Sequence, residues 1–278
     1  MNTIMYDIPA DFKKHGHINK SQYSKLYDES IKDPEAFWGK MGKRIDWIKP
    51  YTQVKDVSFK KENLHIKWYK DGTLNASVNC IDRHLGKHAN ETAIIFEADD
   101  PSKSLKITYQ KLHDEVCKFA NLLIARNVQK GDRVTIYMPM IQEAVYAMLA
   151  CARIGAVHSV VFGGFSPDAL AGRIKDCDSH VVITADQGIR GGQIVPLKLN
   201  VDLALEKDAV EVDTVIVVRH CKEEIPMKDG RDVWAQDEMK KYPPFCEPQE
   251  MNAEDPLFIL YTSGSTGKPK GVMHTTGG

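Results

Sequence analysis

The spacing of apolar residues changes near residue 90 of the chain. Beyond this point, short β-branched apolar runs, typical of buried strands, alternate with stretches whose apolar residues recur every three or four positions, as in helices. The predicted strands span residues 92–97, 105–109, 132–138, 157–162, 180–185, 214–219 and 256–261. The predicted helices span residues 109–125, 141–154 and 197–206, and a further helix begins at residue 166.

Capping residues mark the ends of several predicted helices. Thr108 is the predicted N-cap of the helix over residues 109–125, and Asn127 is its predicted C-cap. Gly155 is expected to end the helix over residues 141–154, because glycine tolerates the left-handed conformation found at many helix ends. Ser166 is followed by a proline and then an acid, which together indicate a helix start.

The alternation of nearly continuous apolar strands with helices predicts the fold class. Such strands are buried on both faces, so we expect an α/β fold with a doubly wound, mostly parallel sheet and helices on both faces. Ligands of these sheets bind beyond the carboxyl ends of the strands. The loops to search are therefore those after Met138, Phe162, Ala185 and Tyr261.

Residues 1–88 lack this alternation of predicted strands and helices. They contain three of the four tryptophans, Trp38, Trp47 and Trp68. We interpret them as an irregular, partly helical extension that precedes the α/β region of residues 89–278. Aromatic residues among lysines can also bind single-stranded nucleic acid. Here phenylalanine and isoleucine lie near the tryptophans, so packing in a core is the better interpretation.

Composition excludes several classes of protein. The 278 residues contain 37 basic and 38 acidic side chains, which gives a net charge of −1 and no general attraction to nucleic acid or anionic membranes. The first residues show no signal-peptide pattern, and the longest apolar stretch has nine residues, against the ~20 that a membrane helix requires. Cysteines and histidines show no metal-ligand spacing. We expect a cytoplasmic protein with small-molecule partners, and neither nucleic acid nor membrane.

The most informative segment follows the last predicted strand. Three glycines, several hydroxyl side chains and two lysines come directly after residues 256–261. Free backbone N–H groups, hydroxyls and a lysine at the end of a strand suit a polyphosphate. The spacing differs from the Walker motif, and a G-x-G-x-x-G fingerprint is absent. The predicted phosphate-binding residues are Thr262, Ser263, Gly264, Ser265, Thr266, Gly267 and Lys268.

This segment, YTSGSTGKPKGV, resembles the signature of the adenylate-forming (AMP-binding) ligases. Residues 37–51, 67–85, 137–166 and 251–278 resemble the acetate–CoA ligases of that family, the acetyl-coenzyme A synthetases, so the likeness extends over essentially the whole chain. The resemblance implies a reaction in which acetate and ATP form acetyl-AMP and pyrophosphate, after which CoA displaces AMP. The implied cofactors are ATP, CoA and Mg²⁺, and residues 262–268 are implied to hold the β- and γ-phosphates.

The resemblance also implies a CoA site. An Arg-x-Gly-Arg segment in this region of the family binds the nucleotide end of CoA, and here the matching residues are Arg190, Gly191, Gly192 and Gln193. Glutamine replaces the second arginine and cannot offer a charged fork to a phosphate. A second segment, Phe162, Gly163 and Gly164, is implied to lie along CoA, although its glycines could also simply turn the chain.

Members of the family continue beyond the position that corresponds to Gly278, and the resemblance places the acetate pocket, the metal positions and the lysine that serves adenylation in that continuation. The resemblance thus implies that residues 1–88 are an N-terminal extension of the acetyl-coenzyme A synthetase type and that residues 89–278 are an incomplete AMP-binding domain. We therefore expect an N-terminal fragment without catalytic or metal-binding residues of its own, inactive when alone. Two alternatives stay open. The parent enzyme could activate propionate, acetoacetate or another short acid, or the chain could be a non-catalytic module that binds CoA or a nucleotide.

Overall fold

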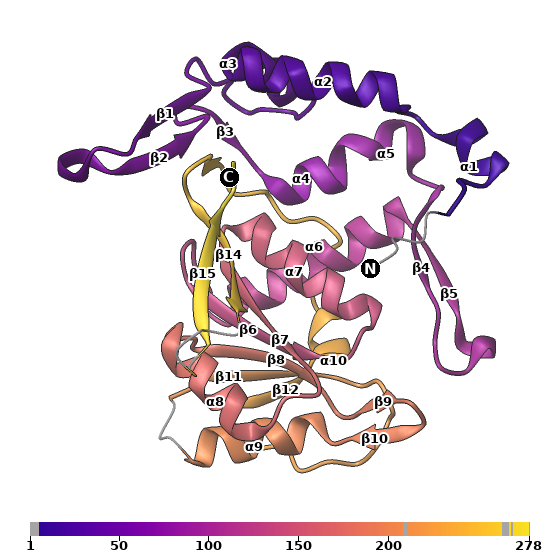
Figure 1. Cartoon of the computed structure of the whole chain (residues 1–278). Coiled ribbons are helices and arrows are strands. Elements are labelled where there is room, and N and C mark those ends of the chain that lie inside the picture. Colours follow the sequence, from indigo (N-terminus) through magenta and orange to yellow (C-terminus); the bar gives the residue numbers. More distant parts are fainter. Residues whose placement is uncertain (1–5, 208–210, 263–266, 268, 278) are drawn as a thin grey trace. The chain divides into compact units, whose positions relative to one another are not determined.

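The structure, a computed structural model, describes residues 6–207, 211–262, 267 and 269–277. The chain divides into two compact units, residues 1–45 and residues 46–278 (Figure 1).

The first unit consists of three helices, α1 (Ala10–His15), α2 (Lys20–Lys32) and α3 (Pro34–Gly42). Reciprocal hydrogen bonds between Asn19 and Gln22 close a capping box at the start of α2. The side chain of Asp33 caps α3, which has proline at its first position. This unit is therefore held largely by local interactions, and α2 has no buried residue among those described.

The second unit begins with short elements that build a small core. The strands β1 (Lys55–Ser58) and β2 (His65–Trp68) pair antiparallel around the 3₁₀ turn η1 (Lys61–Asn63), and β3 (Thr73–Leu74) pairs with β13 (Met251–Asn252). The helices α4 (Ala76–Cys80) and α5 (Asp82–His88) follow. Trp47 and Trp68 pack against this core, so two of the three N-terminal tryptophans serve packing as expected.

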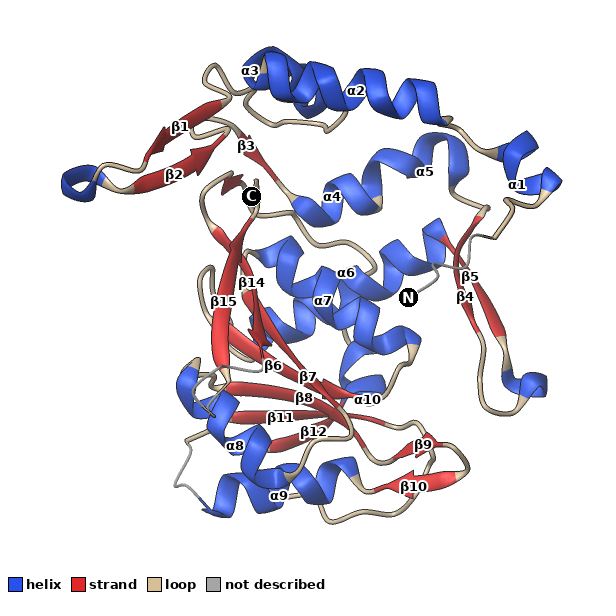
Figure 2. Cartoon of the chain, in the orientation of Figure 1, coloured by secondary structure: helices blue, strands red, loops and turns tan. Residues whose placement is uncertain are grey.

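A seven-stranded sheet forms the centre of the second unit (Figure 2). Its order is β12 (Asp232–Trp234), β11 (Thr214–Val218), β8 (Val181–Ala185), β6 (Arg133–Met138), β7 (Val157–Phe162), β14 (Pro256–Thr262) and β15 (Lys270–Thr275). The first six strands run parallel, and β15 is antiparallel at the edge. The predicted fold class is confirmed.

Helices cover both faces of this sheet. One layer contains α6 (Tyr109–Ala125), α7 (Gln142–Ile154) and α10 (Ala235–Met239), and the other contains α8 (Pro167–Asp176) and α9 (Leu197–Lys207) (Figure 2). Buried aliphatic side chains from both layers and from the sheet form one large core. No helix in the described part of the chain combines the length and the apolar character of a membrane span.

Three of the four predicted cap residues, Thr108, Gly155 and Ser166, are confirmed, whereas the C-cap of α6 is Arg126 and not Asn127. The Thr108 hydroxyl accepts a hydrogen bond from the Lys111 N–H, as expected of an N-cap, and Gly155 has a left-handed φ of +74°. The Ser166 hydroxyl caps α8 in the same way as Thr108 caps α6. Asn127 lies one residue beyond the C-cap of α6 and has a φ of +62°, a conformation that asparagine tolerates better than most residues.

Two predicted strands do not join the main sheet. The strands β4 (Thr92–Phe96) and β5 (Leu105–Thr108) form a separate antiparallel hairpin with the 3₁₀ turn η2 (Pro101–Lys103) in its connection. The shortness of that connection explains why the two strands pair antiparallel with each other, because adjacent parallel strands require a crossover of a dozen or more residues.

Candidate functional site

A cavity of about 810 Å³ lies at the carboxyl edge of the sheet. Its walls come from the loops that follow β6, β7, β8 and β11, and from the β4–β5 hairpin. Three of the four loops chosen from the sequence, those after Met138, Phe162 and Ala185, thus contribute to one cavity. The fourth, after Tyr261, contributes no residue to the described lining.

The cavity brings together two segments that the sequence assigned to CoA. Phe162, Gly163 and Gly164 follow β7, and Arg190 ends the short strand β9 (Gly188–Arg190). The Arg190 guanidinium lies over the Phe162 ring, 4.9 Å from its centroid. This stacking holds a cation against an aromatic face inside the cavity.

The glycines after Arg190 have a structural role that their sequence alone does not reveal. Gly191 and Gly192 have φ values of +57° and +74°, and they join β9 to β10 (Gln193–Val195), in which Gln193 pairs with Arg190. Positive φ at both central residues is the mark of a two-residue type I′ hairpin turn. Arg190 and Gly191 line the cavity, whereas Gly192 and Gln193 are absent from its described lining.

The predicted phosphate-binding segment connects β14 to β15. Thr262 ends β14 and pairs with Lys270, the first residue of β15, and Gly267 between them has a φ of +85°. Ser263, Gly264, Ser265, Thr266 and Lys268 lie outside the described residues. The phosphate-binding role of this segment therefore stays a prediction.

Sequence reasoning missed the part of the cavity that follows β11. His220, Cys221 and Lys222 line it, and a single buried carboxylate, that of Asp186, fixes their backbone. Asp186 Oδ1 accepts hydrogen bonds from the N–H groups of His220 and Cys221 at 2.9 and 3.0 Å. The one sequence signal for this arrangement is an acidic residue placed directly after a buried strand.

Burial changes the proton affinity of one residue in this wall. Desolvation lowers the pKa of His220, the neighbouring Asp186 carboxylate opposes that effect, and Lys103 adds to it. The net effect favours the neutral form of the His220 imidazole.

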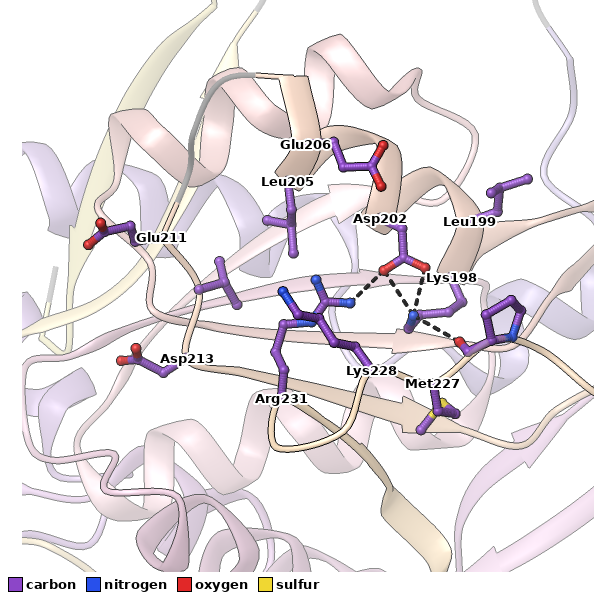
Figure 3. Close-up of a pocket in the computed structure, with 12 residues that line it drawn as sticks. Lys198, Leu199, Asp202, Leu205, Glu206, Glu211, Asp213, Met227, Lys228 and Arg231 are labelled. Carbon is purple, nitrogen blue, oxygen red and sulfur yellow. Dashed lines mark hydrogen bonds and ion pairs between the residues drawn. The ribbon is translucent and has the colours of Figure 1, made fainter.

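A second cavity, of about 750 Å³, lies between α9 and the segment that precedes β12 (Figure 3). Lys198 Nζ contacts Asp202 and Asp232 at 2.7 and 2.8 Å, and Arg231 contacts the same two carboxylates at 2.6 Å. These charges neutralise one another in a nearly buried network. The network joins α9 to the strand β12, and it leaves the two cations committed to protein carboxylates rather than to a ligand.

Comparison with known proteins assigns the chain to a family. Residues 81–278 match the family model described as AMP-binding enzyme. The chain belongs to the AMP-binding enzyme family. Residues 23–80 match the model described as the acetyl-coenzyme A synthetase N-terminus. The two models meet between residues 80 and 81, and the compact units meet between residues 45 and 46, so the division at residue 88 stays a prediction.

Relatives in this family are similar over the whole chain. It is 64% identical over 278 residues to an acetyl-coenzyme A synthetase from Parvibaculum lavamentivorans and 59% identical to one from Bradyrhizobium sp., covering 100% of this chain and 43% of each relative. An acetyl-coenzyme A synthetase from Shewanella frigidimarina is 58% identical over 275 residues, 99% of this chain and 42% of that protein. The chain thus spans less than half the length of these relatives, and the predicted resemblance is confirmed.

A solved structure supports the fold independently. The acetoacetyl-CoA synthetase from Streptomyces lividans superposes with a TM-score of 0.82 over 97% of this chain and 41% of that chain, at 24% sequence identity. At this identity the likeness concerns the fold alone.

Proposed function

We propose that this chain is part of an AMP-forming acetate–CoA ligase. In this proposal the cavity at the carboxyl edge of the sheet binds the nucleotide half of CoA, and residues 262–268 bind the β- and γ-phosphates of ATP. Membership of the AMP-binding family and the names of the relatives support the reaction class. The partners would be small molecules: acetate, ATP and CoA.

The reaction has two displacement steps. A carboxylate oxygen of acetate attacks the α-phosphorus of ATP, the bond from that phosphorus to the bridging oxygen breaks, and pyrophosphate leaves. The sulfur of CoA, having lost its proton, then attacks the acyl carbon, and the bond to the phosphate oxygen breaks to release AMP. Fixed N–H, hydroxyl and lysine donors in residues 262–268 would stabilise the charge that develops on the leaving pyrophosphate.

One observation carries the CoA assignment: a single cavity contains Arg190 stacked on Phe162 beside two glycines, Gly163 and Gly164. Its volume of about 810 Å³ falls within the range of about 300–1,000 Å³ typical of small-molecule sites. A stacked cation suits a nucleotide, which offers both a flat base and phosphates. The two glycines let the segment after β7 pass close to the Met138 carbonyl and to the Arg190–Phe162 pair, where a side chain would not fit.

Mg²⁺ is the metal that the family implies. Within the described ranges, no group of three or more His, Cys, Asp or Glu side chains is arranged to hold a metal ion. These residues therefore do not form a Mg²⁺ site by themselves, and no step of the proposed mechanism is assigned to one. Mg²⁺ stays a prediction as the ion that accompanies ATP.

The test is acetate-dependent exchange of labelled pyrophosphate into ATP, measured on the native protein isolated from its cells. We expect exchange without CoA, and release of AMP rather than ADP when CoA is added. Production of ADP would contradict the proposal, and so would pyrophosphate exchange that proceeds equally well without a carboxylic acid. Propionate and acetoacetate are tested beside acetate, and faster turnover of either would assign a different acyl group. Residues 1–278 expressed alone are expected to show no exchange.

A further inference from the structure

Lys222 has an unusual backbone conformation at the cavity. Its φ is +63°, in the left-handed region that few residues other than glycine adopt. The conformation is maintained because the Lys222 N–H donates to Asp186 Oδ2 at 2.7 Å. A strained residue held by its surroundings beside a cavity is often functional, so the observation raises the question of what its side chain does.

Asp186 holds the whole segment in place and not only Lys222. Its two oxygens accept hydrogen bonds from the N–H groups of residues 220–223, at distances between 2.7 and 3.3 Å. Asp186 itself is 1% exposed and lies directly after β8, in the middle of the sheet. The segment is therefore fixed to the sheet, and Lys222 lies on it where this cavity adjoins a second one lined by Arg219 and Trp234.

Most of the other charges in the cavity wall already have partners. The cations of the wall are Lys103, Arg190 and Lys222, and its carboxylates are Glu97, Asp99 and Asp100. Asp100 accepts hydrogen bonds from the backbone and hydroxyl of Ser102 and lies 3.8 Å from Lys103 Nζ. Glu97 accepts a hydrogen bond from the Ser104 hydroxyl. Lys222 forms no ion pair among the residues that the structure describes, and the residue is exposed to solvent.

The β9–β10 hairpin provides only one cation to this cavity. Gln193, which pairs with Arg190, is neutral, so it can donate a hydrogen bond but adds no charge. A ligand that carries several phosphates requires further positive groups. Lys222, in the same cavity wall as Arg190, is placed to meet that requirement.

We propose that Lys222 is a further CoA-binding residue, and that its ammonium contacts a phosphate of the nucleotide half of CoA beside Arg190. This inference rests on the proposed function. The phosphate is either the 3′-phosphate or the pyrophosphate of CoA, which the experiment distinguishes.

The experiment measures binding of CoA and 3′-dephospho-CoA to the native protein by calorimetry at two salt concentrations. Lys222→Ala removes the charge. Lys222→Gly also removes the charge, and glycine adopts a positive φ without strain. This variant is therefore expected to fold at least as well as the unaltered protein. Lys222→Arg keeps the charge. Lys228→Ala is the matched control, because Lys228 is an exposed lysine of the same β11–β12 connection that lines the other cavity.

We expect Lys222→Ala and Lys222→Gly to weaken CoA binding about fivefold to tenfold, with a shallower salt dependence, while Lys222→Arg and Lys228→Ala bind almost as before. Loss for CoA alone assigns the 3′-phosphate, and equal loss for 3′-dephospho-CoA assigns the pyrophosphate. If the unaltered protein binds CoA and both charge-removing variants bind it equally well, Lys222 is not a CoA-binding residue, and the proposed CoA site itself is not contradicted. If the unaltered chain binds neither form of CoA, the proposed CoA site fails, and the inference fails with it.

Discussion

Gly164 lies so close to Arg190 that a side chain at position 164 would displace the guanidinium. A Cβ built on Gly164 would be 2.9 Å from Arg190 Nη1 and 2.6 Å from Phe162 Cε1. Both atoms belong to the pair that stacks at 4.9 Å in the cavity. The absence of a side chain at position 164 is therefore a condition for placing the arginine over the ring.

Gly164→Ala is expected to weaken CoA binding about tenfold, because the displaced guanidinium loses a charge-assisted contact with the ligand. The free energy of unfolding should change little, because the ends of the Arg190 and Phe162 side chains can move away from the added methyl group. Calorimetry with CoA and thermal unfolding measure the two effects. Gly172→Ala is the control: in α8, its Cβ would meet no described atom within 4 Å, so stability should rise by about 0.5–1 kcal/mol with CoA binding unchanged. If Gly164→Ala binds CoA as tightly as the unaltered protein, the Arg190–Phe162 pair does not contribute to CoA binding.

Gly163 is constrained by backbone rather than by side chains. A Cβ at this position would lie 2.8 Å from the carbonyl oxygen of Met138, the last residue of β6. Since a strand end cannot move as a side chain does, Gly163→Ala should destabilise the fold by about 1–3 kcal/mol. Urea unfolding should show a lower midpoint with an unchanged slope. Equal stability of Gly163→Ala and Gly164→Ala would contradict this distinction.

Local signals in the sequence were sufficient for the central strands and the helices that cover them. The helix over residues 109–125 has the predicted bounds, because its apolar period and the Thr108 cap indicate the same start. The strands β6, β8 and β11 are mostly apolar and almost fully buried, so their burial could be inferred without knowing their neighbours. The rule that ligands bind at carboxyl ends then indicated three loops of the cavity.

Features that depend on contacts far along the chain could not be predicted in this way. Asp186 fixes a segment more than thirty residues away, and nothing local to residues 220–223 indicates that arrangement. Gly191 and Gly192 appeared as part of a binding motif, whereas their φ values assign them to a hairpin turn. Pairing partners and backbone conformation depend on contacts between distant residues in the folded chain, and local sequence patterns do not indicate those contacts.

Arg153 and Asp82 form an ion pair of the same non-local kind. Arg153 is 1% exposed, and its Nη1 and Nη2 contact the two oxygens of Asp82 at 2.9 and 3.0 Å, while its Nε donates to the Cys246 carbonyl. Asp82→Ala leaves a buried cation without its counter-charge, which should cost about 3–5 kcal/mol of unfolding free energy. Urea unfolding measures this loss.

A double variant tests the cause of that loss. Combining Asp82→Ala with Arg153→Met removes both charges, so the double variant should be more stable than the sum of the single losses implies. Strict additivity would show that the two residues act independently and that the ion pair is not what the single variants disturb.

His158 should make stability depend on pH. It is buried in β7 with its ring edge against Phe258, and burial lowers its pKa from 6.5 to about 4. Between these values the unfolded chain binds a proton that the folded chain excludes, so stability falls as pH decreases from 6.5 toward 4. The full effect is about 3 kcal/mol at 1.36 kcal/mol per pKa unit.

The measurement is the free energy of unfolding of the native chain and of His158→Phe at about pH 7, 6 and 5, inside the window that the shift defines. The phenylalanine variant should lose less stability on acidification, because it has no proton to bind in the unfolded state. His17→Phe, at an exposed position of the first unit, is the control and should keep the native pH dependence. The same slope for native chain and His158→Phe would exclude His158 as the source.

Lys268 tests the phosphate-binding segment, whose role rests on its sequence because this residue lies outside the described part of the chain. Lys268→Ala in the native protein should reduce acetate-dependent ATP–pyrophosphate exchange by about 10²-fold, since removing one fixed donor from a developing negative charge commonly has this effect. CoA binding should be unchanged, because the segment contributes no residue to the described lining of the cavity proposed to bind CoA. Lys268→Arg, which retains the charge, should recover part of the rate. Native exchange by Lys268→Ala would remove the segment from ATP binding, whereas equal loss of CoA binding would indicate damage to the fold.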